Sequence, residues 1–312
     1  MKEFAFIEQI SRRFASLPHH GFEGIGDDCA ILPIGEGEVL VFTTDLLCEG
    51  VHFLREATSP RELGRKALAV NLSDVAAMGM HPVATLLSLS LPLDATEEWA
   101  EEFMAGYYEA SEQDAAALIG GDTTRSEGGI TVNVTAIGRG QASHLKRRRD
   151  AQVGDTLFVG APLGGSARGL ADILAGHLTT PHATLHRNPT PQLAEGAWLG
   201  ARPEVHAMMD LSDGLASDIC HLMKQSGVGA EIDLERIPLD EGASMEQAVS
   251  GGEDYKLLFS VEASQAEALM RAYQAHFGTA IYPIGRITAQ KQLRWLERGE
   301  EQAIPWQGFQ HY

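Results

Sequence analysis

The sequence is poor in the features that mark several familiar protein classes. Its 312 residues include only three cysteines, Cys29, Cys48 and Cys220, which are far apart and form no Cys-x-x-Cys pair. This spacing predicts neither a disulfide framework nor a zinc cluster, and it favours a reducing compartment. The longest apolar run, 83–91, stops at Pro92 and is far shorter than a membrane-spanning helix.

Basic residues are also scarce. The chain has 24 Lys and Arg against 43 Asp and Glu, which gives a net charge of −19. Nucleic acid and anionic membranes both select a positive protein surface, so neither is expected as a partner. The first residues follow a helical apolar pattern that includes Glu3 and Glu8, unlike a signal peptide, and we expect a cytoplasmic protein.

The usual nucleotide-binding and zinc-protease motifs are missing. The glycine-rich segment 160–166 lacks the P-loop lysine, and no Gly-x-Gly-x-x-Gly follows a predicted strand. His182 and His186 are four residues apart, but no His-Glu-x-x-His surrounds them. Nearby prolines predict a loop over 181–191, so we assign this pair no role. The basic run 146–149 is either a solvated patch or a phosphate contact.

The most informative stretch that is present is 71–79, Asn-Leu-Ser-Asp-Val-Ala-Ala-Met-Gly. It ends a predicted helix whose start has Ser59 as N-cap, Pro60 in the first turn and Glu62 three residues after the cap. Asp74 lies among Ala, Val and Met, where an unpaired carboxylate is costly to bury. We therefore expect Asp74 to have a partner.

Four other acid-bearing turns could supply that partner. Each is rich in Gly, Ser or Thr, and any one of the acids could be an ordinary turn residue or helix cap. Together, their oxygen atoms suit a hard cation such as Mg²⁺, which would also let so acidic a protein hold phosphates. The turns are 24–28, 43–45, 120–123 and 210–214.

Strands interleaved with helices predict an α/β or α+β architecture, and the length of the chain favours two domains. Strands are expected at 29–32, 38–44, 83–91, 118–119, 130–137, 156–159, 205–209, 230–234 and 256–260. Helices are expected to begin near residues 4, 60, 97, 166, 213 and 263. Thr96 is expected to cap the third of these and Ser212-Asp213 the fifth. Residues 120–129 are expected to form a turn between two strands.

These motifs resemble the thiamine-monophosphate kinase family, within the aminoimidazole-ribonucleotide-synthetase-like superfamily. The resemblance spans nearly the whole chain, with its motifs in the order of the family. They are GIGDDCA at 24–30, TTDLLCEGVHF at 43–53, NLSDVAAMG at 71–79, GGDTT at 120–124, DLSDGLASD at 210–218, GGEDYKLLF at 251–259 and Trp-Gln-Gly-Phe at 306–309.

The resemblance implies a two-domain fold. An N-terminal α/β domain, 1–148, would bind ATP and Mg²⁺ and form a homodimer through its sheet, and 149–312 would be a C-terminal α+β domain. Implied magnesium ligands are Asp28, Thr43, Thr44, Asp45, Asp74, Asp122, Asp210 and Asp213. Implied ATP contacts are Gly121, Asp122, Arg148 and Ser212, and implied contacts to thiamine monophosphate are His52, Glu253 and Phe309.

The implied reaction is ATP-dependent phosphorylation of thiamine monophosphate to thiamine diphosphate. The acceptor is a phosphate already ionised at neutral pH, so direct in-line transfer in a site with several Mg²⁺ ions needs no catalytic base or nucleophile from the protein. Two alternatives stay open. One is a ligase resembling aminoimidazole-ribonucleotide synthetase, and the other is a nucleotide-binding module without turnover.

Overall fold

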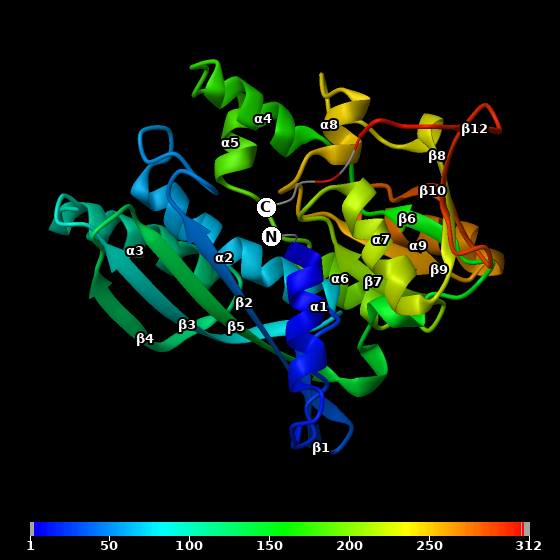
Figure 1. Ribbon diagram of the computed structural model, residues 1–312, viewed down its shortest axis with the longest axis horizontal. Helices are drawn as coiled ribbons and strands as arrows, with labels where there is room; N and C mark the ends of the chain where they lie inside the picture. The colour runs from blue at the N-terminus through cyan, green and yellow to red at the C-terminus, as the bar shows by residue number, and fades with distance from the viewer. Residues whose placement is uncertain (1–2, 307, 309–312) are drawn as a thin grey trace.

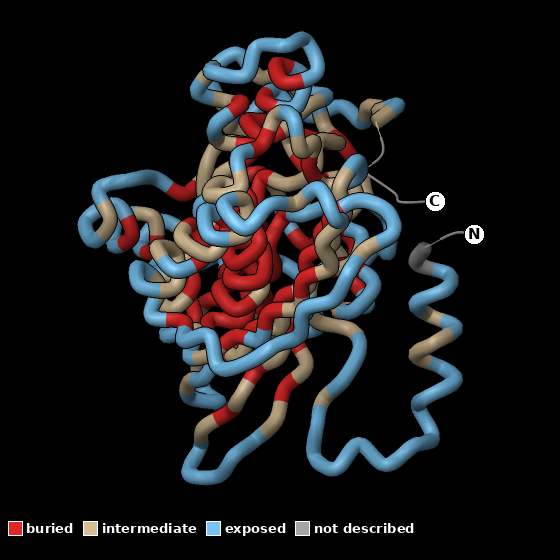
Figure 2. Tube along the Cα trace, turned by 90° about the vertical axis from the view of Figure 1, so that its left-hand side faces the viewer, coloured by how far each residue is buried: buried red, intermediate tan, exposed pale blue. Residues whose placement is uncertain are grey.

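The computed structural model describes residues 3–306 and 308, folded as two sheets with helices around them (Figure 1). Within this part of the chain, no helix is both long and apolar enough to span a membrane. Buried residues concentrate along the middle of the molecule, whereas helix α1 (Glu3–Phe14) stands apart from it (Figure 2).

The N-terminal sheet has five strands in the order β1-β2-β5-β3-β4, with the last pair parallel and the others antiparallel. This arrangement confirms the strands predicted in this half of the chain. Two predicted turns are wrong, because residues 43–45 lie within strand β2 and Gly120, Gly121 and Asp122 lie within strand β4. The strands are β1 (Ala30–Gly35), β2 (Glu38–Cys48), β3 (His81–Leu91), β4 (Ala117–Arg125) and β5 (Thr131–Gln141).

Helix α2 (Pro60–Ala77) is the central element. It begins as predicted, with a capping box in which Ser59 and Glu62 satisfy each other's backbone amides. Most residues of α2 are buried, and they lie on all faces of the helix, because α2 packs against the N-terminal sheet, α3 and the second domain. A helix that is buried all round is typical of the interior of a larger protein, and here it joins the two domains.

Helix α3 (Glu97–Gln113) is capped by Thr96, as predicted, and packs closely on α2. Glycines make this contact possible. A Cβ atom on Gly64 would lie 2.1 Å from the carbonyl oxygen of Phe103, and one on Gly106 would lie 1.9 Å from that of Arg61. Neither position has room for a side chain, so the two helix backbones can approach directly.

The second sheet has seven strands in the order β12-β11-β8-β10-β6-β9-β7, all antiparallel except the β11–β8 pair. Its strands are β6 (Thr156–Val159), β7 (Val205–Asp210), β8 (Gly229–Asp233), β9 (Leu257–Val261), β10 (Tyr282–Thr288), β11 (Leu293–Glu297) and β12 (Glu300–Gln302). The helices are α4 (Gly165–Leu174), α5 (Pro181–Arg187), α6 (Leu193–Gly200), α7 (Leu215–Ser226), α8 (Met245–Ser250) and α9 (Ala266–Phe277).

Two further predictions fail in this half. Residues 181–191 were expected to form a loop, but α5 begins at Pro181, with Thr180 as a side-chain cap. Proline is tolerated at the first helical position because the backbone amide there is unpaired anyway. Ser212-Asp213 does not cap α7. The N-cap residue of α7 is Gly214, with φ of 101°. The backbone amide of Asp213 donates a hydrogen bond to the carboxylate of Asp218 in the first turn of the helix.

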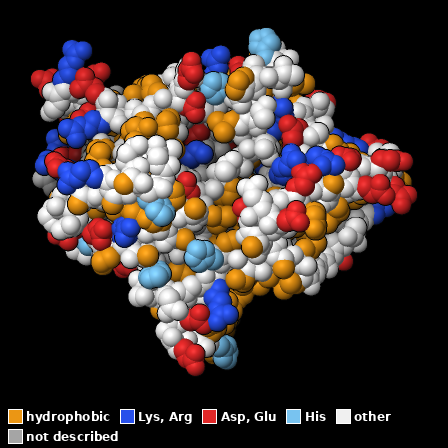
Figure 3. Space-filling view, turned by 180° about the vertical axis from the view of Figure 1, so that it is seen from behind, with side chains coloured by type: hydrophobic (Ala, Val, Ile, Leu, Met, Phe, Trp, Pro, Cys, Tyr) orange, Lys and Arg blue, Asp and Glu red, His pale blue; other side chains and the backbone are white. Residues whose placement is uncertain are grey.

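The surface carries side chains of every chemical type and shows no large region of one charge on the face in view (Figure 3). On the face shown in Figure 3, acidic, basic and apolar side chains are interspersed.

Candidate functional site

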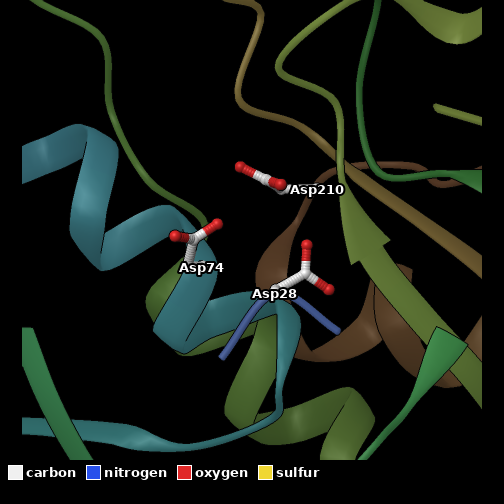
Figure 4. A group of neighbouring side chains, drawn as sticks. All are labelled: Asp28, Asp74 and Asp210. Carbon is white, nitrogen blue, oxygen red and sulfur yellow. The ribbon is translucent and has the colours of Figure 1, made fainter. Parts of the chain in front are cut away.

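Three carboxylates from three distant parts of the sequence face one another at the junction of the domains (Figure 4). Asp28, Asp74 and Asp210 each offer an oxygen atom, and these atoms all lie within 4.8 Å of one another. Asp28 follows the glycine-rich loop before β1, Asp74 lies in the last turns of α2, and Asp210 ends β7. The partner that the sequence predicted for Asp74 is therefore a pair of other acids.

Hydrogen bonds fix each of these carboxylates. The Thr43 hydroxyl donates to Asp74, and the Ser73 hydroxyl donates to Asp210 with 2.5 Å between the oxygens. Asp28 is held by Arg148, whose Nε lies 3.2 Å from Asp28 Oδ2. These contacts orient the carboxylates toward a common centre before any ligand arrives.

The cluster is electrostatically unfavourable by itself. Burial raises the pKa of Asp74 well above its usual range, and repulsion from the neighbouring acids raises it further. The pKa of Asp210 rises to about 8, first because of burial and then because of Asp28. A divalent cation would relieve this repulsion, and a set made only of oxygen donors suits Mg²⁺. The residues present therefore fit the metal that the family implies.

Residues 43–45 lie within strand β2, so their side chains alternate between the two faces of the sheet. Asp45 and Thr43 lie on the face toward α2. The Asp45 backbone amide donates a hydrogen bond to Asn71 Oδ1, and burial raises the pKa of the Asp45 carboxyl to about 6. Thr44 is exposed on the other face, and its hydroxyl donates to the carbonyl oxygen of Val134. The structure thus brings Asp45 and Thr43 to the cluster and leaves the Thr44 side chain away from it.

The cluster opens into a cavity of about 680 Å³ between the domains. Asp45, Asp74 and Asp210 lie in its lining, and so do Ser212 and Asp213, two other residues predicted for the site. Helix α4 supplies an apolar wall. The apolar lining residues from α4 and from the segment after β2 are Ala167, Leu170, Ile173, Leu174, Val51, Phe53 and Leu54.

Both described residues predicted to contact the acceptor also line this cavity. The backbone amide of Cys48 donates to Nδ1 of His52, so the neutral ring carries its proton on Nε2. Glu253 is held through its carboxylate by Lys66, with 3.0 Å between Nζ and Oε2. The third predicted contact, Phe309, lies outside the described residues.

Sequence reasoning missed three basic residues in the cavity lining, Lys66, His186 and Arg187. His186 was left without a role, yet it lies on α5 with Nδ1 2.9 Å from the Ser166 hydroxyl and 3.4 Å from Glu253 Oε2. Its neighbour Arg187 forms an ion pair with Glu62, and Lys66 carries no motif. A signal was available for α5, because Thr180 followed by proline is a helix start.

Gly121 and Asp122 are not brought to the cluster. Asp122 pairs with Ser88, and that row of the sheet continues through Asn133 to Leu46 on β2. Three strand spacings, or about 14 Å, therefore separate Asp122 from β2 within one chain. Every residue of β4 is exposed.

Known proteins resemble this chain over nearly its whole length. The N-terminal domain of AIR synthase related proteins matches residues 26–140, and their C-terminal domain matches residues 152–295. The thiamine-monophosphate kinase of Escherichia coli is 38% identical over 99% of this chain and 98% of its own length. The thiamine-monophosphate kinase of Salmonella typhimurium is 37% identical with the same coverage. The chain belongs to the thiamine-monophosphate kinase family.

A solved structure of the same family agrees in fold. AaThiL complexed with AMPPCP and TMP superposes with a TM-score of 0.86, at 32% sequence identity, covering 100% of this chain and 97% of that one. The two-domain fold implied by the sequence motifs is therefore confirmed.

Proposed function

We propose that the chain transfers a phosphoryl group from ATP to thiamine monophosphate and forms thiamine diphosphate. Family membership supports this reaction, and so does the complex of a relative with AMPPCP and TMP. The observation that carries the proposal in this chain is the cavity. It has a cluster of carboxylates at one end and His52 with the half-buried Glu253 at the other.

Asp28, Asp74 and Asp210 are the residues that would hold Mg²⁺, joined by Thr43 and Asp45, which lie on the same side of the sheet. Asp213, in the cavity lining, is a further candidate. Bound Mg²⁺ supplies neutralisation of phosphate charge and a fixed orientation for the two phosphates. Arg148 contributes a positive charge at the same end, since it is hydrogen bonded to Asp28.

The acceptor would lie with its phosphate at the carboxylate end and its rings toward His52 and Glu253. The protonated Nε2 of His52 can donate a hydrogen bond, and Glu253 can accept one from an amino group. Helix α4 gives the same space an apolar wall against which the rings could pack. Phe309 is proposed from its motif alone as a stacking contact.

Transfer is proposed to be direct. A covalent route needs a nucleophile beside an activating base, and the described lining of the cavity contains no cysteine. Its serines are Ser212 and Ser250, and the Ser250 hydroxyl donates to the backbone of its own helix. Incubation with γ-labelled ATP and no acceptor should leave the protein unlabelled, and initial-rate lines should intersect.

We also propose that two copies pair through the N-terminal sheet, with residues 1–148 and 149–312 as the two domains. The face of the sheet away from α2 exposes apolar side chains of Leu46 and Leu86, and the edge strand exposes Leu118 and Ile119. Such a patch is typical of an interface. Asp122 lies on this exposed edge strand, where it and Gly121 could serve a site shared with the partner. Light scattering of the wild type and of Leu86→Asp would test this pairing.

The deciding experiment is incubation with Mg-ATP and thiamine monophosphate, followed by detection of thiamine diphosphate. Formation of ADP and thiamine diphosphate in equal amounts is the expected result. Binding of ATP without turnover on this acceptor would favour the nucleotide-binding alternative. ATP consumption only with an amidine-type cyclisation substrate would favour the ligase.

A further inference from the structure

Lys66 is a cation buried at the ring end of the cavity. It lies on α2 with only 1% of its surface exposed, and it lines the cavity. Its ammonium group donates to the carbonyl oxygen of His52 over 3.1 Å and to Glu253 Oε2 over 3.0 Å. Burying an ammonium ion is strongly unfavourable unless its partners are well placed, so these two contacts define its environment.

The two acceptors come from opposite walls. His52 belongs to the segment after β2 in the N-terminal domain, whereas Glu253 precedes β9 in the C-terminal domain. Both are proposed to contact thiamine monophosphate. One ammonium group therefore connects the two proposed acceptor contacts across the domain junction.

The helix that carries Lys66 also carries Asp74. The two residues are eight positions apart, which is about 12 Å along a helix. Because α2 is buried on every side, it acts as a rigid spacer between the carboxylate end of the cavity and the ring end. The position of Lys66 thus sets where the ring contacts lie relative to the metal-binding acids.

Glu253 depends on this cation. Its backbone has φ of 64°, a left-handed conformation that a residue with a side chain rarely adopts, and its amide donates to the Ser212 carbonyl over 2.7 Å. Burial alone would raise the pKa of Glu253, but the charge of Lys66 and its hydrogen bond lower it below its usual value. The carboxylate is therefore held charged although its side chain is only 21% exposed in the cavity wall.

We infer that Lys66 is a positioning residue for the acceptor, which fixes Glu253 and the His52 segment in the geometry that recognises the rings of thiamine monophosphate. The inference rests on the proposed function. It assigns Lys66 no contact with the reacting phosphates, so the effect of its loss should fall on the acceptor and not on ATP.

A purely structural role for a buried lysine has a clear counterpart in the same chain. Lys146 is 5% exposed, and its ammonium group donates to the carbonyl oxygens of Arg202 and Val205, each over 2.7 Å. It does not line the cavity. Lys146→Met is therefore the matched control for Lys66→Met, because both remove a buried charge bound to two acceptors.

The test compares KM values for both substrates and calorimetric binding of thiamine monophosphate. Lys66→Met should raise the KM and the dissociation constant for thiamine monophosphate by roughly tenfold or more, which corresponds to about 1.4 kcal/mol. The KM for ATP should change less than about twofold. Lys146→Met should lower thermal stability and leave both KM values within about twofold of wild type.

A double-mutant cycle separates positioning from general destabilisation. If Lys66 acts through Glu253, Lys66→Met/Glu253→Gln should bind thiamine monophosphate about as weakly as Glu253→Gln alone. The double variant leaves no unpaired charge, so it decides the matter even if Lys66→Met fails to fold. Additive losses, or equal rises in both KM values, would overturn the inference.

Failure of the proposed function has a different signature. A wild-type protein that forms no thiamine diphosphate would remove the kinase assignment. The binding measurements on wild type and variants would still show whether Lys66 controls the affinity of the cavity for this ligand.

Discussion

The hydroxyl of Ser73, in the N-terminal domain, donates a hydrogen bond to Asp210, in the C-terminal domain, with 2.5 Å between Ser73 Oγ and Asp210 Oδ2. The next residue in the helix is Asp74, whose carboxylate faces the same centre (Figure 4). Packing of α2 against β7 therefore places acids from both domains in one cluster. The cluster forms only when the domains dock.

Ser73→Ala should lower kcat by about 10- to 100-fold, because loss of a hydrogen bond that orients a metal-binding carboxylate typically has this effect. The fold should be retained, as judged by circular dichroism. Ser111→Ala is the matched control, since its buried hydroxyl has no hydrogen-bond partner among the described residues. That variant should be as active as wild type. Full activity in Ser73→Ala would contradict the orienting role.

Asp74→Asn should abolish turnover while leaving the metal-free protein at least as stable as wild type. The carboxylate is buried beside Asp45, Asp210 and Asp28, which raise its pKa after burial has done so, and the amide removes that repulsion. Thermal melts in EDTA and a turnover assay check the two parts. A folded variant with wild-type activity would remove Asp74 from the metal site.

His186 should make stability depend on pH. Burial lowers its pKa from 6.5 to about 4, with Lys66 as the next cause. Between these values the unfolded chain binds more protons than the folded protein, so stability rises with pH up to about 6.5 and is lost as pH falls. The whole effect is on the order of 3 kcal/mol.

Urea unfolding of wild type and His186→Gln at pH 7 and pH 5 measures this contribution. The loss of stability on acidification should be smaller in His186→Gln than in wild type. His177→Gln, which alters an exposed histidine, should behave as wild type. Identical pH dependence in wild type and His186→Gln would show that His186 is not buried as a neutral ring.

Gly106→Ala should destabilise the protein by about 1–3 kcal/mol, the usual result of forcing extra atoms into a packed contact. The added Cβ would lie 1.9 Å from the carbonyl oxygen of Arg61, so α3 must move away from α2. Gly128→Ala is the control, because its nearest neighbour would be 4.0 Å away. Chemical denaturation compares the two. An unchanged midpoint for Gly106→Ala would mean that the helices are less tightly packed than described.

Local signals were read correctly where the deciding interaction is close in sequence. The capping box at Ser59 and Glu62 fixes the start of α2, because both partners lie within one helical turn. The loop expected over 181–191 was wrong for a local reason, since proline was interpreted as a helix breaker although Pro181 occupies the first position of α5. The turn expected at Gly120 was wrong because strand pairing with β3 extends β4 across two glycines.

The sequence by itself determined the family and the reaction through its ordered motifs. It also pointed to Asp28, Asp74 and Asp210, the three acids that the structure brings together. It could not determine which of Thr44 and Asp45 faces the cluster, since strand alternation places them on opposite faces but does not say which face is covered. Nor could it single out Lys66 or His186. The partner of Lys66 is Glu253, 187 residues away in the sequence, and that of His186 is Ser166, 20 residues away. Only tertiary packing brings these groups together, because the free energy of a buried charge is set by the neighbours that folding provides.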